Sequence, residues 1–198
     1  MPRVIALNGP VGVGKTTLLN ELSNQLSNSY VIPEYIDVLD DAQQLLHDYL
    51  EGILPAYDFQ DYILDYYESV ANSLINSSYD YILVERSPVE GIVFFAKLDL
   101  DNNRLTQTQY NLLLQRAQLM SFYPNPLKDE SITLFTDNLT SSQLTEFIEP
   151  WLSNISVIKL RASLFTIRSR IHERGRLCEI EHYTDDYLKR MIESYYRI

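Results

Sequence analysis

Short runs of apolar residues alternate along this chain with longer segments in which apolar residues recur every three or four positions. A short apolar run is typical of a buried parallel strand, and the longer period is typical of a helix. The runs predict strands over Arg3–Leu7, Tyr30–Pro33, Tyr81–Val84, Ile132–Phe135 and Ser156–Leu160. The periodic segments predict helices over Lys15–Ser27, Asp40–Tyr49, Asp58–Asn76, Pro88–Lys97, Thr106–Phe122, Ser141–Trp151, Leu164–Glu173 and Asp185–Tyr196. Strands separated by helices predict an α/β fold, a five-stranded parallel sheet with helices on both faces.

The segment between the first predicted strand and helix, Gly9–Thr16, has the phosphate-loop pattern G-x-x-x-x-G-K-[ST]. Glycines let backbone N–H groups close around phosphates, and the helix N-terminus adds partial positive charge. In this pattern Lys15 reaches the β- and γ-phosphates, and the Thr16 hydroxyl is a Mg²⁺ ligand. An ordinary glycine-rich turn is the alternative, but it requires neither the strand before it nor the helix after it. We therefore predict that the chain uses a nucleoside triphosphate.

Length and composition limit the class of protein. A chain of 198 residues, 45% of them hydrophobic, suits one domain with a sizeable core. The formal net charge of −11 argues against a nucleic-acid-binding surface, because phosphate backbones are bound by clustered Lys and Arg. The single cysteine, Cys178, has no partner for an internal disulfide, and no apolar stretch approaches the ~20 residues of a membrane span. We expect a soluble, cytoplasmic single domain over residues 1–198, without signal or transit peptide, acting on a small molecule with no nucleic-acid or membrane partner.

Charged residues follow two of the predicted strands. Pro33-Glu34 ends the second strand, and Glu85-Arg86-Ser87 follows the third. In parallel sheets, ligands bind at the carboxyl ends of the strands, which is where the phosphates are expected. Ser87, Pro88 and Glu90 also fit the N-cap, N1 and N3 positions of a helix, and capping alone is the alternative. Because capping does not explain Glu85 and Arg86, we interpret these two as functional.

Residues 161–176 form a basic stretch in an acidic chain. Arg170 and Arg174 are four residues apart, so their guanidinium groups can converge on one helix face, and Arg176 follows Gly175, where the helix can break. A kinase needs such a lid, because planar Arg forks neutralise the charge on the transferring phosphoryl group. The alternative is a solvated basic helix end, favoured by the helix dipole. The arginines of the stretch are Arg161, Arg168, Arg170, Arg174 and Arg176.

Together, these residues resemble the deoxynucleoside kinase family, which includes deoxycytidine, deoxyguanosine and insect multisubstrate kinases and, more distantly, herpesvirus thymidine kinases. The resemblance runs through almost the whole chain. Its anchors are Gly9–Thr17, Pro33-Glu34, Phe59-Gln60, Glu85-Arg86-Ser87 and the lid pattern from Arg170 to Glu179. It implies a P-loop kinase three-layer sandwich with an Arg-rich lid over about residues 170–181. It also implies transfer of the ATP γ-phosphate to the 5′-hydroxyl of a deoxynucleoside.

The resemblance also implies roles for residues near the reacting groups. Glu34 matches the general base that takes the proton of the 5′-hydroxyl, for which a carboxylate is chemically suited. Arg86 matches the arginine at the 5′-oxygen and phosphate, and Glu85 would support Mg²⁺ directly or through water. Tyr49 and Glu179 match the ligands of the sugar 3′-hydroxyl. A surface glutamate at a strand end and a packing tyrosine are the plain alternatives for Glu34 and Tyr49.

For the base, Gln60 matches the glutamine whose amide pairs with the base edge. Phe95 would stack on the base and Phe59 would line the pocket, although helical spacing alone also fits two core residues. Lid arginines and phosphate-loop residues would hold the ATP. The implied ATP-binding residues are Gly9, Gly12, Gly14, Lys15, Thr16, Thr17, Arg170, Arg174 and Arg176.

The chain departs from the family pattern in two places. Tyr35 replaces the proline that usually follows Pro-Glu. The Arg–Asp pair above the base in deoxycytidine-type members falls on Tyr67 and Gly91, so that pair is absent. A glycine and a neutral tyrosine leave the space beside a pyrimidine C5 open and uncharged, which predicts that thymidine or another pyrimidine is favoured.

Two other functions compete with a deoxynucleoside kinase. A thymidylate-type monophosphate kinase shares the phosphate loop, the strand-end acid–Arg pair and the Arg-rich lid, but not Pro33-Glu34 or the spacing of Tyr49 and Gln60. A regulatory P-loop NTPase would need a Walker-B-type Asp and residues that position water, and no such set is evident. Family resemblance also implies a homodimer formed through helices beside the sheet, with the Tyr-rich segment Tyr57–Tyr67 as a contributor.

Overall fold

Five parallel strands form one sheet in the order β2-β3-β1-β5-β4 in the computed structural model, which describes residues 2–137 and 139–196. The strands are β1 (Arg3–Asn8), β2 (Ser29–Ile32), β3 (Tyr81–Glu85), β4 (Ser131–Phe135) and β5 (Val157–Arg161). The predicted five-stranded parallel sheet is confirmed, and the ends of each predicted strand lie within two residues of the observed ends. Central β1 pairs with β3 on one side and β5 on the other, so the strand order reverses there. A crevice for ligands is expected at the carboxyl ends beside such a reversal.

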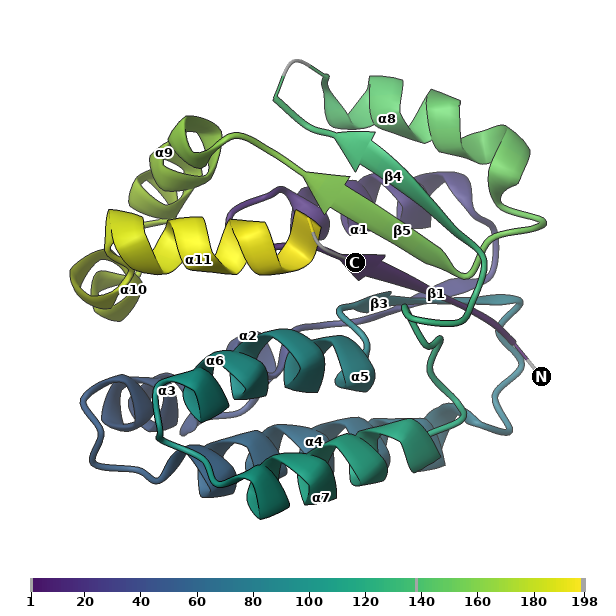
Figure 1. Ribbon diagram of the computed structural model, residues 1–198. Helices are drawn as coiled ribbons and strands as arrows, with labels where there is room; N and C mark the ends of the chain where they lie inside the picture. Colours follow the sequence, from purple (N-terminus) through teal and green to yellow (C-terminus); the bar gives the residue numbers. More distant parts are fainter. Residues whose placement is uncertain (1, 138, 197–198) are drawn as a thin grey trace.

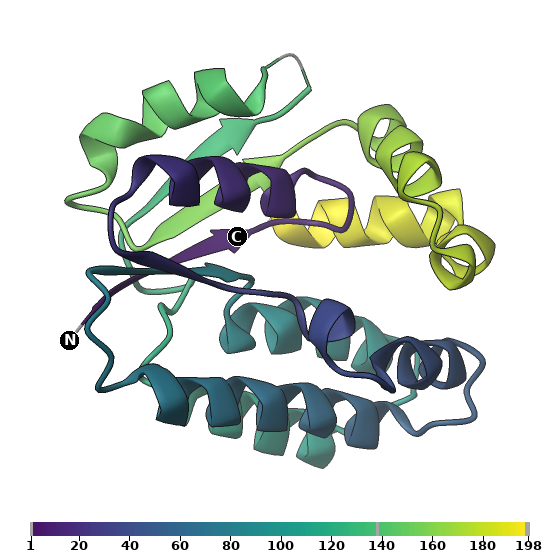
Figure 2. The same cartoon turned by 180° about the vertical axis from the view of Figure 1, so that it is seen from behind.

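Helices cover both faces of the sheet, as predicted. In Figures 1 and 2, α1 and α8 lie on one side of it, and α4 to α7 lie on the other. Helices α9, α10 and α11 lie beyond the carboxyl end of β5 (Figure 1). The helices are α1 (Lys15–Gln25), α2 (Tyr35–Val38), α3 (Ala42–Leu50), α4 (Ala56–Leu74), α5 (Pro88–Gly91), α6 (Lys97–Asp101), α7 (Gln107–Leu119), α8 (Ser141–Ile148), α9 (Leu164–Arg174), α10 (Leu177–His182) and α11 (Asp185–Tyr196), with a π-helical turn η1 (Ile92–Ala96) and a 3₁₀ turn η2 (Glu149–Trp151).

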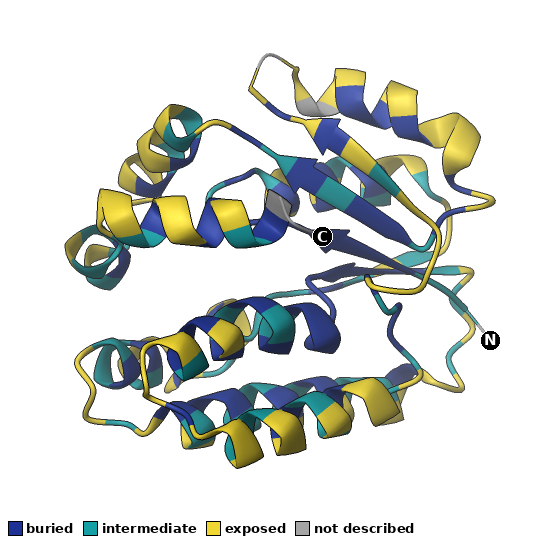
Figure 3. Ribbon diagram, viewed as in Figure 1, coloured by how far each residue is buried: buried dark blue, intermediate teal, exposed yellow. Residues whose placement is uncertain are grey.

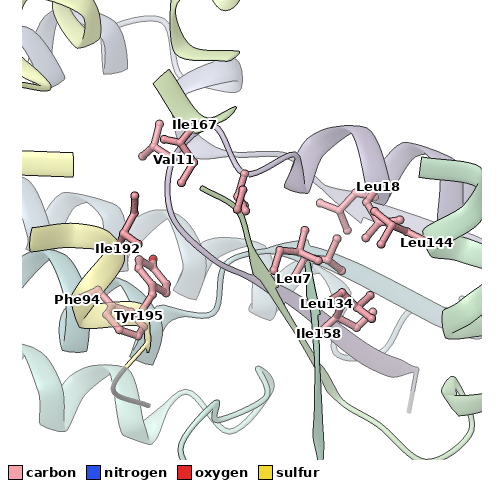
Figure 4. Close-up of a cluster of buried hydrophobic side chains, with 14 of the residues drawn as sticks. Leu7, Val11, Leu18, Phe94, Leu134, Leu144, Ile158, Ile167, Ile192 and Tyr195 are labelled. Atoms are coloured by element: carbon pink, nitrogen blue, oxygen red, sulfur yellow. The ribbon is translucent and has the colours of Figure 1, made fainter. Parts of the chain in front are cut away.

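The apolar core follows the predicted pattern. The central strands are buried on both faces, whereas the outer faces of α4, α7 and α8 are exposed (Figure 3). Figure 4 shows apolar side chains of the sheet meeting those of α1 and α8, and burial of each such side chain contributes about 1.5–3 kcal/mol. Phe94 and Tyr195 stack with ring centroids 3.7 Å apart, which attaches α11 to η1. Among the helices described, none has an apolar stretch sufficient to span a lipid bilayer.

Three local features differ from the prediction. The helix predicted over Pro88–Lys97 extends to Asp101 and contains the π-helical turn η1. The short helices α2 and α10 were not predicted, because four or six residues are too few to show a period. The predicted ends of the other helices differ from the observed ends by a few residues.

Candidate active site

A cavity of about 460 Å³ opens at the carboxyl ends of the strands. Every residue predicted for catalysis or binding lines it except Gly9. The predicted residues in its wall are Gly12, Gly14, Lys15, Thr16, Thr17, Glu34, Tyr49, Phe59, Gln60, Tyr67, Glu85, Arg86, Gly91, Phe95, Arg170, Arg174, Arg176 and Glu179. These residues come from segments up to 167 positions apart, Gly12 to Glu179, and their convergence identifies the cavity as the candidate active site.

Two glycines of the phosphate loop are required by close backbone contacts. A Cβ on Gly9 would lie 2.7 Å from the Leu160 carbonyl oxygen, so Gly9 supports the loop against β5 instead of lining the cavity. Gly12 has φ +75°, and a Cβ there would lie 2.9 Å from the Ile167 carbonyl oxygen. Larger residues at either position would displace the loop from β5 or α9.

Lys15 is buried within the loop. Its Nζ donates hydrogen bonds to the carbonyl oxygens of Gly9 and Pro10, both at 3.0 Å, and lies 3.6 Å from Glu85. Burial, together with the nearby Arg86, lowers the pKa of Lys15 to about 8. The ammonium is therefore held in the loop, adjacent to the space where phosphates would lie.

Thr16 and Glu85 place two oxygen ligands side by side. The Thr16 hydroxyl donates to Glu85 Oε2 at 2.6 Å, and Glu85 is buried at the end of β3. Hydroxyl and carboxylate oxygens are the hard donors that Mg²⁺ prefers, and Mg²⁺ commonly takes one or two protein ligands plus phosphate oxygens and water. The pair fits that ion, although among residues 2–137 and 139–196 no cluster of three acidic, His or Cys side chains forms a complete metal site.

Glu34 and Arg86 form a largely buried ion pair across the ends of β2 and β3, with side chains 13% and 10% exposed. Arg86 Nη1 donates to Glu34 Oε1 at 3.0 Å. Burial would raise the pKa of Glu34, but the nearby charges of Arg86, Lys15 and Arg176 hold it below its ordinary value. Arg86 has φ +71°, an uncommon backbone conformation for a residue with a side chain. Glu34 is thus an ionised carboxylate facing the cavity.

Glu90 supports this pair from behind. It is fully buried, and its Oε1 accepts hydrogen bonds from Gly9 N–H at 2.9 Å and from the Tyr195 hydroxyl at 2.6 Å. Arg86 Nε lies 3.5 Å from the same oxygen. Burial raises the pKa of Glu90 to about 7. Ser87 caps α5 by accepting from Glu90 N–H, so the capping interpretation is correct for Ser87, while Glu85 and Arg86 face the cavity.

The basic stretch divides into two groups. Arg170, Arg174 and Arg176 line the cavity, whereas Arg161 and Arg168 do not. Gly175, with φ +74°, ends α9 where a break was predicted. Beyond it, Arg176 Nη1 lies 3.4 Å from Glu179 and 3.8 Å from Glu34, and its Nη2 donates to Asp37 at 2.5 Å.

The other two cavity-facing arginines of the stretch have different partners. Arg174 pairs with Glu179. Arg170 donates to the Val13 carbonyl at 2.8 Å and to Thr136 Oγ1 at 3.0 Å, so it anchors the phosphate loop to the end of β4. Arg174 and Arg176 are thus paired with carboxylates, and the anionic phosphates of a nucleotide would compete with these carboxylates for the two arginines.

Aromatic side chains form the opposite wall of the cavity. Phe59 stacks on Tyr49 with centroids 4.2 Å apart, and the Arg86 guanidinium lies over Phe95 at 4.9 Å. Phe59 also belongs to a buried apolar cluster, so it is both a core and a wall residue. The Tyr67 hydroxyl donates to the Glu85 carbonyl at 3.1 Å, and a Cβ on Gly91 would meet no atom within 4 Å.

Several residues in or behind the wall were not predicted. Asp99 accepts a hydrogen bond from the Tyr49 hydroxyl at 2.8 Å. Tyr183 and Tyr187 follow the lid and stack with centroids 5.0 Å apart. The wall therefore contains five tyrosines: Tyr35, Tyr49, Tyr67, Tyr183 and Tyr187. In a chain with fifteen tyrosines, the four-residue spacing of Tyr183 and Tyr187 was the only available signal.

Comparison with known proteins identifies the family and the fold. A family model described as deoxynucleoside kinase matches residues 5–198. A solved structure of deoxyadenosine kinase from M. mycoides with bound dATP has a TM-score of 0.64, 23% identity, and coverage of 98% of this chain and 82% of that one. The structure of the same kinase with bound dCTP has a TM-score of 0.63 and 22% identity, and that with the products dCMP and a flexible dCDP has a TM-score of 0.62 and 24% identity. In both, the match covers 98% of this chain and 81% of that one. At these identities the likeness concerns the fold, and no curated protein matched the sequence.

Proposed function

This chain belongs to the deoxynucleoside kinase family, and we propose that it transfers the ATP γ-phosphate to the 5′-hydroxyl of a pyrimidine deoxynucleoside, with thymidine preferred. The observation that carries the proposal is the Glu34–Arg86 pair, 3.0 Å apart, in the same cavity as the phosphate loop. A general base must lie within hydrogen-bond reach of the proton that it takes. Glu34 is the ionised carboxylate in that position.

In the proposed reaction, the protein positions two substrates and neutralises charge. Lys15 and the loop N–H groups hold the donor phosphates, and Glu34 accepts the proton of the 5′-hydroxyl as its oxygen attacks the γ-phosphorus. The bond from that phosphorus to the ADP oxygen breaks, and Arg86, Arg174 and Arg176 stabilise the charge on the transferring group. Thr16 and Glu85 would hold Mg²⁺, which neutralises charge on the β- and γ-phosphates.

The base preference is proposed from Tyr67, Gly91 and Gln60. No atom lies within 4 Å of a Cβ built on Gly91, and the Tyr67 hydroxyl is directed to the Glu85 carbonyl, so no charged group is placed beside a pyrimidine C5 by these positions. The Gln60 amide can accept from thymine N3–H and donate to O4. Because one methyl group changes binding by only about 1–3 kcal/mol, deoxycytidine is expected to be a slower alternative substrate.

The competing nucleoside is deoxyadenosine, which is named as the substrate of the structurally similar kinase. Tyr67 lines the cavity and is only 5% exposed, so it is a fixed part of the wall against which either kind of base would have to fit. Comparison of kcat/KM for thymidine, deoxycytidine, deoxyadenosine and deoxyguanosine with ATP and Mg²⁺ tests the preference. A clear purine preference would contradict it.

The same assay tests the reaction class. Deoxynucleosides should be phosphorylated and dTMP should not, whereas turnover of dTMP alone would indicate a monophosphate kinase. Phosphate release from ATP without any acceptor would favour a regulatory NTPase. A Lys15→Ala variant is the control for contaminating kinases, because it removes the ammonium that contacts the donor phosphates.

We also propose that residues 1–198 act as a single cytoplasmic kinase domain that forms a homodimer. The support for the dimer is the pair of helices α4 and α7, which lie side by side in the layer farthest from the sheet (Figure 1). The Tyr-rich segment Tyr57–Tyr67 is part of α4. Light scattering at several protein concentrations would measure the assembly, and a monomer at all of them would refute the dimer.

A further inference from the structure

Two consecutive tyrosines of α4 contact the carboxyl ends of two different strands. The Tyr66 hydroxyl donates a hydrogen bond at 2.7 Å to the carbonyl oxygen of Pro33, the residue that follows β2. The Tyr67 hydroxyl donates at 3.1 Å to the carbonyl oxygen of Glu85, the last residue of β3. Consecutive side chains on a helix point about 100° apart, and β2 and β3 are adjacent strands. A single turn of α4 can therefore contact both strand ends.

The two carbonyl groups belong to the peptide bonds that lead into the ion pair of the cavity. The Pro33 carbonyl is part of the peptide bond to Glu34, and the Glu85 carbonyl is part of the peptide bond to Arg86. The side chains of these two residues then meet, with Arg86 Nη1 donating to Glu34 Oε1 at 3.0 Å. Each tyrosine hydroxyl thus holds the main chain directly before one member of the pair.

The backbone at Arg86 has particular need of such support. Its φ of +71° is uncommon for a residue with a side chain, and such conformations persist only where the surrounding structure fixes them. The peptide group between Glu85 and Arg86 is fixed at both ends: its N–H donates to the Leu7 carbonyl at 3.0 Å, and its carbonyl accepts from Tyr67. Without the Tyr67 hydroxyl, only the N–H end of this peptide group would be held.

Both hydroxyl groups are dependable donors. Tyr67 is 5% exposed, and the Tyr123 hydroxyl donates to its carbonyl oxygen at 2.7 Å, while the two rings meet edge to face with centroids 5.3 Å apart. Burial raises the pKa of Tyr66 to about 12 and that of Tyr67 well above its ordinary value. The two phenols therefore keep their protons at any pH at which the protein would be assayed.

We propose that Tyr66 and Tyr67 are positioning residues whose hydroxyl groups hold the Glu34–Arg86 pair in the geometry that the reaction requires. The proposal rests on the proposed function, in which Glu34 takes the proton of the 5′-hydroxyl. Tyr66 acts on Glu34 through the peptide bond before it, and Tyr67 acts on Arg86 in the same way. Loss of either hydroxyl loosens one member of the pair, while both aromatic rings stay in place.

The variants Tyr66→Phe and Tyr67→Phe remove only these hydroxyl groups. Each should lower kcat by about tenfold, because a small displacement of a reacting group is costly. The KM for the nucleoside should change little, since neither hydroxyl is assigned to the base or the sugar. A normal kcat in either variant would overturn the role of that tyrosine.

The pH profile separates positioning from a general loss of structure. Burial alone would raise the pKa of Glu34, and Arg86 is the foremost of the charges that oppose this effect. The other opposing charges are Lys15, Arg176 and Arg174. A looser pair therefore raises the pKa of Glu34, and the acid limb of kcat/KM, which reports the base of the free enzyme, should move to higher pH in both variants. A lower kcat with an unshifted limb would show a structural role only and would overturn the proposal.

Two further measurements test whether each hydroxyl acts through the pair. In a Glu34→Gln background, Tyr66→Phe should cause no further loss of kcat, because the group that it positions is already removed. A second tenfold loss would show that Tyr66 acts elsewhere. For Tyr67→Phe, the ratio of kcat/KM for thymidine and deoxycytidine should equal that of the unmodified protein. A changed ratio would assign the Tyr67 hydroxyl to the base and overturn its part of the proposal.

The matched control is Tyr123→Phe. Tyr123 is 6% exposed, does not line the cavity, and donates its hydroxyl proton to the Tyr67 carbonyl, so this variant removes a buried hydrogen bond to α4 but none to a strand end. It should keep the kcat and the pH profile of the unmodified protein. Equal losses in Tyr123→Phe would show that any loosening of α4 is sufficient and would overturn the inference. Failure of the unmodified protein to phosphorylate any deoxynucleoside would instead overturn the proposed function.

Discussion

Glu34 and Arg86 follow two different strands, yet Arg86 Nη1 donates to Glu34 Oε1 at 3.0 Å inside the cavity. Adjacent β2 and β3 run parallel, so their carboxyl ends meet, and the residues after them face each other. The arginine keeps the carboxylate ionised and leaves its second oxygen free of this contact. The proposed base and the proposed phosphate-binding group are thereby placed together.

Glu34→Gln should lower kcat by about 10²-fold or more while nucleoside binding survives, because the variant keeps the shape and removes only the base. Single-turnover kinetics and calorimetric titration with the nucleoside measure the two effects. Asp37→Asn is the control, since Asp37 is a nearby carboxylate that also pairs with Arg176. Near-normal kcat in Glu34→Gln would remove Glu34 from the mechanism.

Arg174→Ala and Arg176→Ala should lower kcat by more than they weaken nucleoside binding, because the charge that they meet develops mainly in the transition state. Arg168→Ala is the matched control: Arg168 lies on the same helix as Arg174, pairs with Asp185 and does not line the cavity. If all three variants turn over normally, the stretch is only a basic helix end.

The variants Gly12→Ala and Gly52→Ala distinguish the cost of a left-handed backbone conformation from the cost of a steric contact. The two glycines have nearly equal φ, +75° and +76°, but a Cβ lies 2.9 Å from the Ile167 carbonyl at Gly12 and meets nothing within 4 Å at Gly52. Both variants should be less stable to unfolding by roughly 1–2 kcal/mol, the cost of a non-glycine residue in a left-handed conformation. Only Gly12→Ala should also lose ATP binding. Urea unfolding and ATP titration measure these losses, and intact ATP binding in Gly12→Ala would contradict the steric argument.

The raised pKa of Glu90 predicts that the stability of the folded protein depends on pH. Its pKa is raised from 4.5 to about 7, so the folded protein binds a proton that the unfolded chain has lost between these values. The stability contributed by this proton is complete below pH 4.5 and is lost as the pH rises through 7. Glu90→Gln stays neutral, so its free energy of unfolding relative to the unmodified protein should increase across that window.

Urea unfolding on both sides of the window measures the effect. Exposed Glu146→Gln is the control and should follow the unmodified protein at every pH. Parallel pH profiles for Glu90→Gln and the unmodified protein would show that Glu90 does not bind the proton.

The sheet and the phosphate loop were predictable because their signals are local. A parallel strand buried on both faces is a continuous apolar run, and the loop pattern lies within Gly9–Thr16. The charged residues at the ends of β2 and β3 could be placed at one edge as soon as the strands were recognised as parallel. The turn η1 was not predictable, since a wider helical turn leaves no distinct apolar period.

The supporting residues of the site could not be found in the same way. Asp99 contacts a side chain 50 positions away, and Glu90 contacts Tyr195 at a separation of 105. Each pair joins two separate helices, and no spacing in the sequence indicates which faces meet. The family pattern supplied residues that line the cavity, but the buried carboxylates that contact them depend on the packing of this particular chain.

The distribution of aromatic residues has a practical consequence for measuring ligand binding. Five tyrosines line the cavity, whereas the chain's one tryptophan, Trp151, lies half exposed on η2 outside it. Fluorescence excited selectively in the indole will report on the surroundings of η2 and remain nearly silent when a nucleoside enters. Phenol emission will be quenched by a base stacked among the tyrosines, so the protein carries its own optical probe of occupancy without a label.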